Sequence, residues 1–568
     1  MGSGGCRARI FHVNDVYVLD HLPALKTCVA KQSEGFPPNN VLTTLAGDFL
    51  GPSLLSSLDH GKGMVDCLNN VPVDVVCFGN HESDVPYQSL ARRVKEFNGT
   101  WLNSNMPTFE PKCPAHACFQ FEGGRSIAMI GLNVGGGAHA SLYRRGSMGG
   151  HAANIVPVLD AVDDAVAAAR AAYPGADCVV ALTHQDMSDD VEMAKRGLVP
   201  VILGGHDHGR FDETHDGCRV VKAGEDARAV VVVDLFWPEG APARAIPEVT
   251  VRFEDLAPPK PEKGQQVPTW IPEYAPDPVL LTATEHWMAP ARELENATLA
   301  HILTEPPLTS LNVRKRPSTM AQLLATAVRD VVGADAAFMN AGGIRGNKTY
   351  DDGLITYAHL NAECPFPSSN VVIKIEGAKM SQALAQSRQA WLDERGPKED
   401  GHAFQHDEGI EVDEKHEIVT VRGAPFDPQT TYALAVDAYM VRANPVLKQW
   451  AADHPELIPP DDAGRPALPI LVQYFCDLAW HSLVDRDGDG TLDQAEIDTF
   501  FDEADKNGDG NIDEAEVLAV LKKRLGYMAC GVVARQMLAI ADCDQNGKVS
   551  KKELCDILLA KVKEHGRA

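Results

Sequence analysis

The sequence predicts an α/β protein in three parts: a layered sheet domain, a second mixed α/β region and an all-α tail. Between residues 8 and 253, short apolar runs alternate with amphipathic or alanine-rich stretches, which is typical of a sheet covered by helices on both faces. Residues 256–277 are rich in Pro, Lys, Glu and Gln, as linkers often are. From about residue 470, helical stretches alternate with turns rich in Asp and Gly.

The individual elements follow from this pattern in order. Strands of the first region are expected at residues 9–13, 41–46, 73–78, 127–132, 178–183 and 199–203, with helices at 85–97 and 165–172. One more helix is expected at residues 278–295. The predicted division of the chain is 1–255 for the first domain, 256–295 for the linker and connecting helix, 296–460 for the second domain, and 470–568 for the tail.

The composition excludes several classes of protein. The 568 residues are 44% apolar and 23% charged, unlike collagen-like, disordered or membrane-embedded chains. No run approaches the roughly eighteen apolar residues that a membrane span requires, so no transmembrane segment is expected. The 79 acidic and 52 basic residues give a net charge of −27, which repels polyphosphate backbones. We therefore expect no nucleic acid polymer as a partner.

The cysteines and the N-terminus predict a cytoplasmic protein. The 13 cysteines are widely spaced and include no C-x-x-C pair, so we expect reduced thiols rather than a disulfide framework. The chain begins MGSGGCRARIFHVND, and a strand-like segment starts around Arg7. No apolar segment precedes it, so no signal peptide is expected.

Side chains that can bind metals follow five of the apolar runs. Ligand sites of α/β proteins gather at the carboxyl ends of strands, so these side chains are expected to lie together. Asp, Asn and His suit Zn, Mn or Fe. They exceed what one ion can use, but two ions about 3.5–4 Å apart could share a carboxylate. The residues are Asp15, Asp48, Asn80, His184, His206 and His208.

In this order the motifs resemble those of the calcineurin-like metallophosphoesterases, in the branch of the 5′-nucleotidases and UDP-sugar hydrolases. The resemblance covers about residues 8–450. It implies a four-layer α/β/β/α metallophosphatase domain, followed by an α/β domain of the 5′-nucleotidase C-terminal type. It also implies the metal ligands: Asp15 and His208 for one ion, Asn80, His184 and His206 for the other, and Asp48 as the bridge.

The same resemblance implies that His81 and Asp84 form a catalytic pair. His81, as an imidazolium, would stabilise the developing negative charge or protonate the leaving oxygen, while Asp84 would fix its orientation. A hydroxide activated by two metals attacks phosphorus directly, so no covalent nucleophile is required. The alternative for Asp84 is that it caps the helix expected from residue 85.

The sequence departs from the family at Tyr17, where the motif has a histidine ligand two residues after Asp15. A neutral phenol is a poor ligand because its proton has a pKa near 10. Tyr17 could bind a more acidic ion such as Fe(III), as in purple acid phosphatases, or could pack beside a first metal held by fewer ligands. Neither His12 nor His21 has the spacing to replace the missing histidine.

A second candidate site begins with AAFMNAGGIR at residues 336–345. Glycines let a ligand approach the backbone, and arginine offers a planar fork for phosphate. The stretch resembles the N-x-G-G-I-R motif of the 5′-nucleotidase C-terminal domain. The resemblance implies that Arg345 and Arg316 bind the phosphate side of the substrate with Asn340 beside them. It also implies that Phe366 and Tyr439 stack on a nucleobase. The alternative for both rings is core packing.

Pro445 replaces the aspartate with which the family accepts hydrogen bonds from ribose hydroxyls. Because proline has no such acceptor, the substrate preference could have moved away from nucleosides. The sequence therefore supports phosphatase activity more strongly than nucleotidase activity.

Three segments of the tail have the twelve-residue spacing of calcium loops: 485–496, 505–516 and 542–553. Each has oxygen ligands at alternate positions, glycine at position 6, an apolar residue at position 8 and glutamate at position 12. These segments resemble EF-hands. The expected calcium ligands are Asp485, Asp487, Asp489, Thr491, Glu496, Asp505, Asn507, Asp509, Asn511, Glu516, Asp542, Asp544, Asn546, Lys548 and Glu553.

Spacing predicts how these loops combine. The 25 residues between the second and third loops allow two helices, so these loops should pair. The 8 residues between the first and second loops allow only one shared helix, so the first loop should either stand alone or contact the catalytic region.

Together these observations predict a dimetal phosphoesterase that acts on phosphate monoesters, with 5′-nucleotides as the expected substrates and Ca²⁺ bound in the tail. One alternative is a phosphodiesterase acting on nucleotide-sugars or cyclic nucleotides, because the same metal pair can attack these esters. Another is a catalytically impaired calcium-binding protein on a phosphatase fold, to which Tyr17 and Pro445 point. Calcium could order the tail against the second domain or stabilise the tail alone.

Overall fold

The computed structural model describes residues 5–143, 146–258, 272–366, 369–393, 396–459, 464–544 and 546–565. The chain forms two compact units, Met1–Ala289 and Pro290–Ala568. The boundary lies inside helix α7 (Pro278–Glu295), which occupies the residues at which the sequence predicts a helix. Part of the predicted linker, residues 259–271, lies outside the described residues.

The first unit contains two six-stranded sheets. The first sheet has the order β12-β11-β1-β2-β3-β4, and the second has the order β5-β6-β7-β8-β10-β9. Their strands are β1 (Gly5–Asn14), β2 (Val41–Ala46), β3 (Val75–Cys77), β4 (Thr100–Leu102), β5 (His116–Gln120), β6 (Ser126–Asn133), β7 (Cys178–His184), β8 (Val201–Gly205), β9 (Arg210–His215), β10 (Cys218–Ala223), β11 (Ala229–Pro238) and β12 (Glu248–Asp255).

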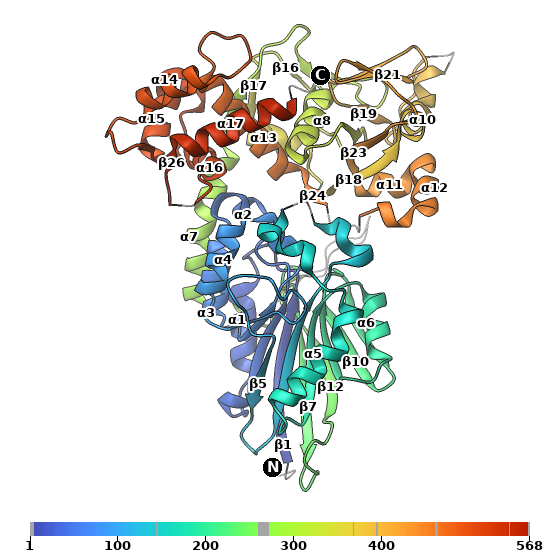
Figure 1. The fold of residues 1–568 in the computed structure, drawn as a ribbon, viewed down its shortest axis with the longest axis vertical. Helices are drawn as coiled ribbons and strands as arrows, with labels where there is room; N and C mark the ends of the chain where they lie inside the picture. The colour runs from blue at the N-terminus through green and yellow to red at the C-terminus, as the bar shows by residue number, and fades with distance from the viewer. Residues whose placement is uncertain are drawn as a thin grey trace. The chain divides into compact units, whose positions relative to one another are not determined.

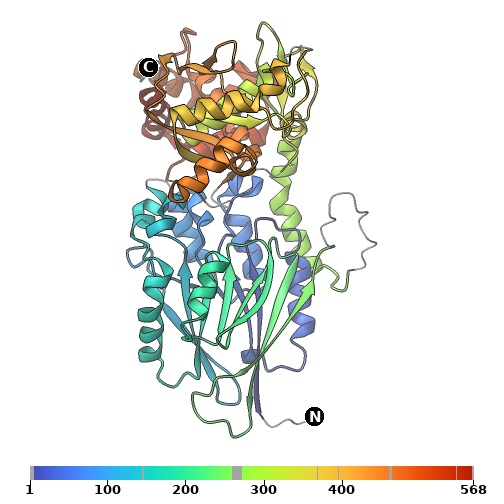
Figure 2. The same cartoon turned by 90° about the vertical axis from the view of Figure 1, so that its right-hand side faces the viewer.

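Helices cover the outer face of each sheet, which confirms the predicted four layers (Figures 1 and 2). Successive strand residues point to opposite layers, so Ile10 of β1 lies between the two sheets while Phe11 faces the helices. On the first sheet lie α1 (Leu22–Gln32), α3 (Lys62–Asn70) and α4 (Tyr87–Glu96); on the second lie α5 (Val158–Ala172) and α6 (Met187–Ala194). A short helix, α2 (Leu54–Asp59), precedes α3.

Most expected elements form, but some boundaries differ. The run at 73–78 gives only three strand residues, and the run at 199–203 gives a strand that starts two residues later. The helix expected from residue 85 begins at Tyr87, because Val85 and Pro86 are extended. The helix expected at 165–172 is the end of α5.

The second unit has a five-stranded sheet of order β19-β15-β23-β18-β24. Its core lies between this sheet and helices that include α10 and α12. The strands are β15 (Ala336–Asn340), β18 (Ser369–Glu376), β19 (Phe404–His406), β23 (Thr431–Asp437) and β24 (Arg465–Pro466). The helices are α8 (Thr319–Val332), α9 (Tyr357–Glu363), α10 (Gly377–Ser387), α11 (Ala438–Ala443) and α12 (Pro445–Asp453). Smaller ladders are formed by β13 (Thr298–His301) with β17 (Leu354–Thr356), β14 (Leu308–Thr309) with β16 (Thr349–Tyr350), and β20 (Ile410–Val412), β21 (Ile418–Val421) and β22 (Ala424–Pro425).

Helix α13 (Ala467–Val484) joins this α/β region to the helical tail. It packs against α8 on one side and against α16 (Gly531–Ala541) on the other, where the Trp480 indole donates a hydrogen bond to the Met537 carbonyl (2.9 Å). By length and composition α13 could cross a membrane, with a mean hydropathy of 1.2, but 56% of it is buried in this unit. The other tail elements are α14 (Gln494–Ala504), β25 (Asn511–Ile512), α15 (Glu514–Arg524), β26 (Val549–Ser550) and α17 (Lys551–His565).

Candidate functional sites

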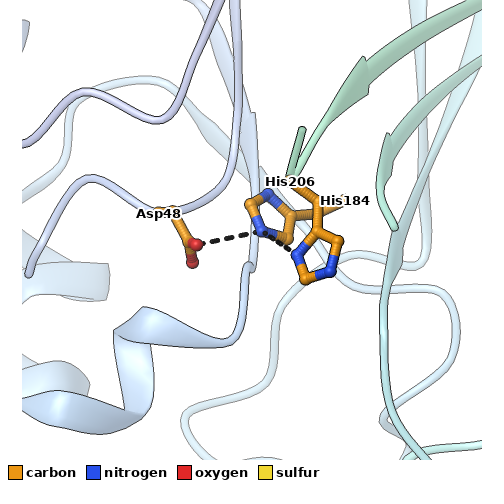
Figure 3. Close-up of side chains that lie close together, drawn as sticks. All are labelled: Asp48, His184 and His206. Carbon is orange, nitrogen blue, oxygen red and sulfur yellow. Dashed lines mark hydrogen bonds and ion pairs between the residues drawn. The ribbon is translucent and has the colours of Figure 1, made fainter. Parts of the chain in front are cut away.

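Four predicted ligands meet at the carboxyl ends of β2, β3, β7 and β8. The Asp48 carboxylate oxygen Oδ2 lies 3.0 Å from His184 Nε2, and His184 Nε2 lies 3.4 Å from His206 Nδ1 (Figure 3). The Asn80 side-chain oxygen lies 3.2 Å from the first imidazole and 3.1 Å from the second. All four side chains are buried. The strand-end pattern in the sequence therefore corresponds to one compact cluster.

A second group of donors forms around Asp15. The Tyr17 hydroxyl donates to Asp15 Oδ1 at 3.2 Å and lies 3.1 Å from His208 Nε2. His208 Nε2 is 3.6 Å from the same carboxylate oxygen. The other oxygen of Asp15 accepts a hydrogen bond from the backbone N–H of His206 at 2.9 Å, which connects this group to the first. Tyr17 thus stands among the proposed ligands.

The carboxylates of both groups attract positive charge. Burial disfavours the charged form of His184, but Asp48 and Asp15 outweigh it and raise the pKa to about 10. Burial likewise opposes charge on His208, whose contacts with Asp15 and Glu225 raise its pKa to about 11. The imidazoles in turn hold the pKa of Asp15 well below its usual range, against the effect of burial. Buried carboxylates therefore need positive charge here.

The donor set fits a metal ion of the kind that the family implies. Asp48, His184 and His206 each present a ligand atom, and these atoms lie within 4.8 Å of one another. Asp48 Oδ2 is buried, and its 3.0 Å contact with His184 Nε2 leaves a lone pair of this oxygen for a cation. Carboxylate, amide and imidazole donors suit Zn, Mn or Fe.

Three proposed ligands hold an unusual backbone conformation. Asp15, Asp48 and His206 have φ values of 55°, 53° and 80°, in the left-handed region that side chains disfavour. Such residues cost on the order of 1–3 kcal/mol each and cluster at functional sites. The backbone strain at these three residues therefore lowers the stability of the fold while it directs their side chains toward the cluster.

Glu82 is a site residue that the sequence argument did not identify. Its buried carboxylate accepts backbone hydrogen bonds from Asp48, Phe49, Leu50 and Gly79, at 2.6–3.1 Å. Burial and the charge of Asp48 raise its pKa. Glu82 thereby holds the loop that carries Asp48. Its position directly after the G-N-H motif is the only signal for it in the sequence.

His81 and Asp84 form the expected pair. They lie on a short 3₁₀ helix (His81–Asp84), with His81 Nδ1 2.7 Å from Asp84 Oδ2. The backbone N–H of His81 donates to Asp48 Oδ1 at 2.7 Å, which fixes the imidazole beside the metal cluster. Asp84 does not cap α4, since Pro86 occupies the N-cap position. This geometry favours the pair over the capping alternative.

The nearby histidines are not part of the cluster, as the spacing predicts. His12 contacts Thr44 Oγ1 (3.0 Å) and the Gly204 carbonyl (2.9 Å), and burial lowers its pKa to about 4. His21 contacts the Asp226 carbonyl at 2.8 Å.

In the second unit, the predicted aromatic residues are exposed. Phe366 is 48% and Tyr439 is 55% accessible, so neither is packed into the core. The Arg345 guanidinium lies over the Phe366 ring at 5.2 Å, and His402, which the sequence argument missed, stacks on Tyr439 with centroids 6.3 Å apart. Exposed rings beside cationic or planar groups suit stacking on a ligand.

The remaining predicted binding residues are Asn340, at the end of β15, and Arg316, in the segment before α8. Asn340 accepts the Gly342 N–H at 3.0 Å, which closes the turn that leads to Arg345. The Arg316 carbonyl accepts a hydrogen bond from buried Gln405 at 2.9 Å. The structure thus brings Arg345 and Phe366 together.

Pro445 has a structural role in this chain. It is the first residue of α12, where proline needs no N–H partner, and Asn444 caps the helix by accepting the N–H groups of Val446 (3.0 Å) and Leu447 (3.1 Å). The Asn444-Pro445 sequence that replaces the family's aspartate is therefore a helix start.

The three calcium loops adopt the expected geometry. The first carboxylate of each loop, on Asp485, Asp505 or Asp542, accepts the N–H of the glycine at position 6 at 2.8–3.1 Å. Those glycines have φ values of 77–84°, in the left-handed region that the sharp turn requires. Two groups, Asp485 with Asp487 and Glu496, and Asp542 with Asp544 and Glu553, place their ligand atoms within 4.8 Å.

The pairing of the loops matches the prediction from spacing. Ile512 of the second loop pairs with Val549 of the third in a short antiparallel ladder, β25 with β26. A single helix, α14, separates the first loop from the second, and no strand forms at Leu492. The first loop instead follows α13, the helix that packs against α8 of the α/β region.

Comparisons with known proteins agree with this architecture. Residues 8–210 match the calcineurin-like phosphoesterase family, residues 297–449 the 5′-nucleotidase C-terminal domain, and residues 496–559 the EF-hand domain pair. Protein UshA of Yersinia enterocolitica is 24% identical over 481 residues, covering 75% of this chain and 84% of that protein. The uncharacterized metallophosphoesterase YunD of Bacillus subtilis is 21% identical, covering 76% of this chain and 91% of that protein.

Solved structures share the fold. NAD nucleotidase (NadN) of Haemophilus influenzae superposes with a TM-score of 0.64 at 15% identity, covering 83% of this chain and 96% of that one. A putative 5′-nucleotidase of Staphylococcus aureus gives a TM-score of 0.52 at 15% identity, covering 82% and 96%. The chain therefore contains a calcineurin-like phosphoesterase domain, a 5′-nucleotidase C-terminal domain and an EF-hand pair, and this combination indicates a metal-dependent hydrolase of phosphoric esters.

Proposed function

We propose that the protein is a dimetal phosphomonoesterase that hydrolyses 5′-nucleotides. The observation that carries the proposal is the buried cluster of Asp48, Asn80, His184 and His206 beside the His81–Asp84 pair. When bound, two metal ions would supply an activated hydroxide and offset the charge of the phosphate.

Residues of the first unit would bind the metal ions and donate a proton to the leaving oxygen. Asp48 would bridge the two ions, with Asp15 and His208 on one side and Asn80, His184 and His206 on the other. The contact of His81 Nδ1 with Asp84 orients the ring, so that Nε2 is the nitrogen that would donate to the leaving oxygen. Asp84 would also stabilise the imidazolium.

Residues of the second unit would provide substrate recognition. Arg345 and Arg316 would neutralise phosphate oxygens with Asn340 beside them, and Phe366 and Tyr439 would stack on the base. The accessibility of both rings supports this role. Two proteins of similar structure, an NAD nucleotidase and a putative 5′-nucleotidase, are named for nucleotides as well.

We further propose that Tyr17 is a ligand of the first metal and favours Fe(III) there. Its hydroxyl oxygen lies within 3.1–3.2 Å of donor atoms of His208 and Asp15, as a shared ion would require. A phenolate oxygen is a hard, anionic donor, and such donors suit a trivalent ion. Protein loaded with Fe(III) should show a visible charge-transfer band that Tyr17→Phe abolishes. An unchanged band in Tyr17→Phe would exclude Tyr17 as a ligand.

The activity is tested by measuring phosphate release from chelator-stripped protein that is resupplied with Mn, Zn or Fe. AMP, p-nitrophenyl phosphate, a UDP-sugar and a cyclic nucleotide serve as substrates, with His81→Ala as the control. We expect metal-dependent hydrolysis of AMP that His81→Ala loses. Hydrolysis of p-nitrophenyl phosphate alone would remove the nucleotide from the proposal. Turnover only of the UDP-sugar or the cyclic nucleotide would show a phosphodiesterase. No turnover with any metal would leave a calcium-binding protein on a phosphatase fold.

A further inference from the structure

Lys222 of β10 is a fully buried lysine that contacts the backbone beside the proposed metal ligands His184 and His206. Its side chain is 0% accessible. The ammonium donates to the carbonyl oxygens of Gln185 (2.7 Å) and Gly205 (2.8 Å) and to Asp207 Oδ2 (2.6 Å). It also lies 3.0 Å from Asp190 Oδ2, which is equally buried. The three N–H bonds of the ammonium are therefore all used.

These partners flank two proposed metal ligands. Gln185 directly follows His184, while Gly205 and Asp207 stand on either side of His206. Asp190 completes the arrangement around the first histidine, because its Oδ1 accepts hydrogen bonds from the side chains of Thr183 (2.8 Å) and Gln185 (2.9 Å). Lys222 and Asp190 together thus hold the residues before and after both imidazoles.

The charge of this group is balanced within the fold. Burial disfavours the charged lysine, but Asp190 and Asp207 outweigh it and raise its pKa, so the ammonium stays protonated. The packing is tight as well, since a Cβ on Gly204 would lie 2.8 Å from both Lys222 Cε and Asp190 Oδ2. A neutral side chain at position 222 would leave two buried carbonyls without donors and two carboxylates without a counter-ion.

We propose that Lys222 is a positioning residue that sets the directions of His184 and His206 for metal binding. The Lys222 ammonium contacts the ends of both β7 and β8, so it fixes the spacing between the two imidazoles as well as the orientation of each. The role of Lys222 rests on the proposed dimetal site. It differs from a ligand role, because the ammonium carries no lone pair for a metal.

The test compares Lys222→Met with Arg125→Met. Arg125 forms a largely buried ion pair with Asp177 (2.9 Å), which precedes β7 at the end opposite His184, so this control removes a similar contact away from the cluster. Chelator-stripped proteins are titrated with Co²⁺ and followed by visible absorption, and their thermal unfolding is measured without metal. Hydrolysis of p-nitrophenyl phosphate gives KM and kcat separately.

We expect Lys222→Met to bind Co²⁺ about 10–100-fold more weakly, with an altered absorption spectrum and a lower kcat at similar KM. Arg125→Met should unfold at a lower temperature but bind Co²⁺ as the wild type does. Wild-type affinity and spectrum in Lys222→Met would overturn the positioning role.

If Lys222→Met does not fold, Asp207→Asn takes its place. Asp207 is partly exposed, and its substitution weakens only the contact of Lys222 beside His206. Asp207→Asn should weaken Co²⁺ binding, and unchanged binding would contradict the proposal. A wild-type protein that binds no Co²⁺ would instead overturn the metal site itself.

Discussion

Among single residues, Gly79 shows how closely the proposed ligands are packed. A Cβ at this position would lie 2.2 Å from Asp48 Oδ1, so an alanine would force the carboxylate to move. We expect Gly79→Ala to weaken metal binding and to lower the free energy of unfolding by about 1–3 kcal/mol. Metal titration and chemical unfolding of the chelated protein measure the two effects. Gly175→Ala, which meets no atom within 4 Å, is the matched control.

The His81–Asp84 pair predicts a separation of chemistry from metal binding. The His81 ring is held by Asp84 and is not one of the proposed metal ligands, so His81→Ala should lower kcat by roughly 10²–10⁴-fold while the protein retains its metal. Asp84→Asn should have a smaller effect on kcat, because this variant retains the His81 imidazole itself. Steady-state kinetics and metal analysis of the same preparations test this. Loss of metal from His81→Ala would contradict the assignment.

The sequence predicts those site residues that follow strands, and it misses those that act across the sheet. Asp48, His184 and His206 each follow an apolar run within three residues, and the carboxyl ends of adjacent strands bring them together. Lys222 sits inside a strand, where it looks like an ordinary surface lysine until the packing of β7 and β8 is known. Such contacts depend on tertiary structure, which local pattern does not contain.

For the calcium-binding elements, the pairing of loops predicts two kinds of site. The second and third loops share a ladder, so a ligand lost from one should weaken calcium binding at both. Glu516→Gln or Glu553→Gln should therefore weaken calcium binding at two sites, whereas Glu496→Gln should weaken it at only one. Calorimetric titration with Ca²⁺ gives the number and affinity of the sites. Independent loss of single sites in all three variants would show that the ladder does not couple them.

Element boundaries depended on details that periodicity does not show. Pro86 delays α4 because its preceding residue is held extended, and the apolar run that ends at Phe78 supplies only a short strand. Ladders of two residues, such as β14 with β16, have no periodic pattern and could not be predicted. The EF-hand pairing was predictable because loop spacing alone determines it.

The whole molecule should lose stability as the pH falls. Burial lowers the pKa of His12 in the first unit and of His406 in the second to about 4, whereas the unfolded chain binds these protons near pH 6.5. Because the unfolded state takes up more protons between these values, the free energy of unfolding decreases on acidification. Each histidine should remove on the order of 3 kcal/mol between pH 7 and pH 4.

Matched variants assign this pH dependence to the two units. Chemical unfolding of the chelated protein is measured from pH 7 to pH 5, with fluorescence of each unit followed separately. His12→Gln should flatten the pH dependence of the free energy of unfolding for the first unit only. His406→Gln should do the same for the second unit only. A slope that neither variant changes would mean that other groups dominate the acid response.

At the scale of the molecule, the sequence indicates three folding regions, but it does not show how closely the last two are joined. Helix α13 begins at Ala467 and packs against both α8 and α16. Its apolar residues look like the core of a separate helical tail when read alone. A truncation before residue 470, where the tail is predicted to begin, cuts this helix near its start, so a deletion has to begin before Ala467.

The position of α13 also affects biosynthesis. Helix α8 is made early in the second unit, yet its partner α13 is complete only when Val484 has left the ribosome. Until then the apolar surface of α8 that α13 covers stays exposed to solvent or to chaperones. The nucleotidase-type region of a nascent chain is therefore complete only once α13 is made, and a premature stop within α13 would disturb the packing of α8 as well as remove the calcium loops.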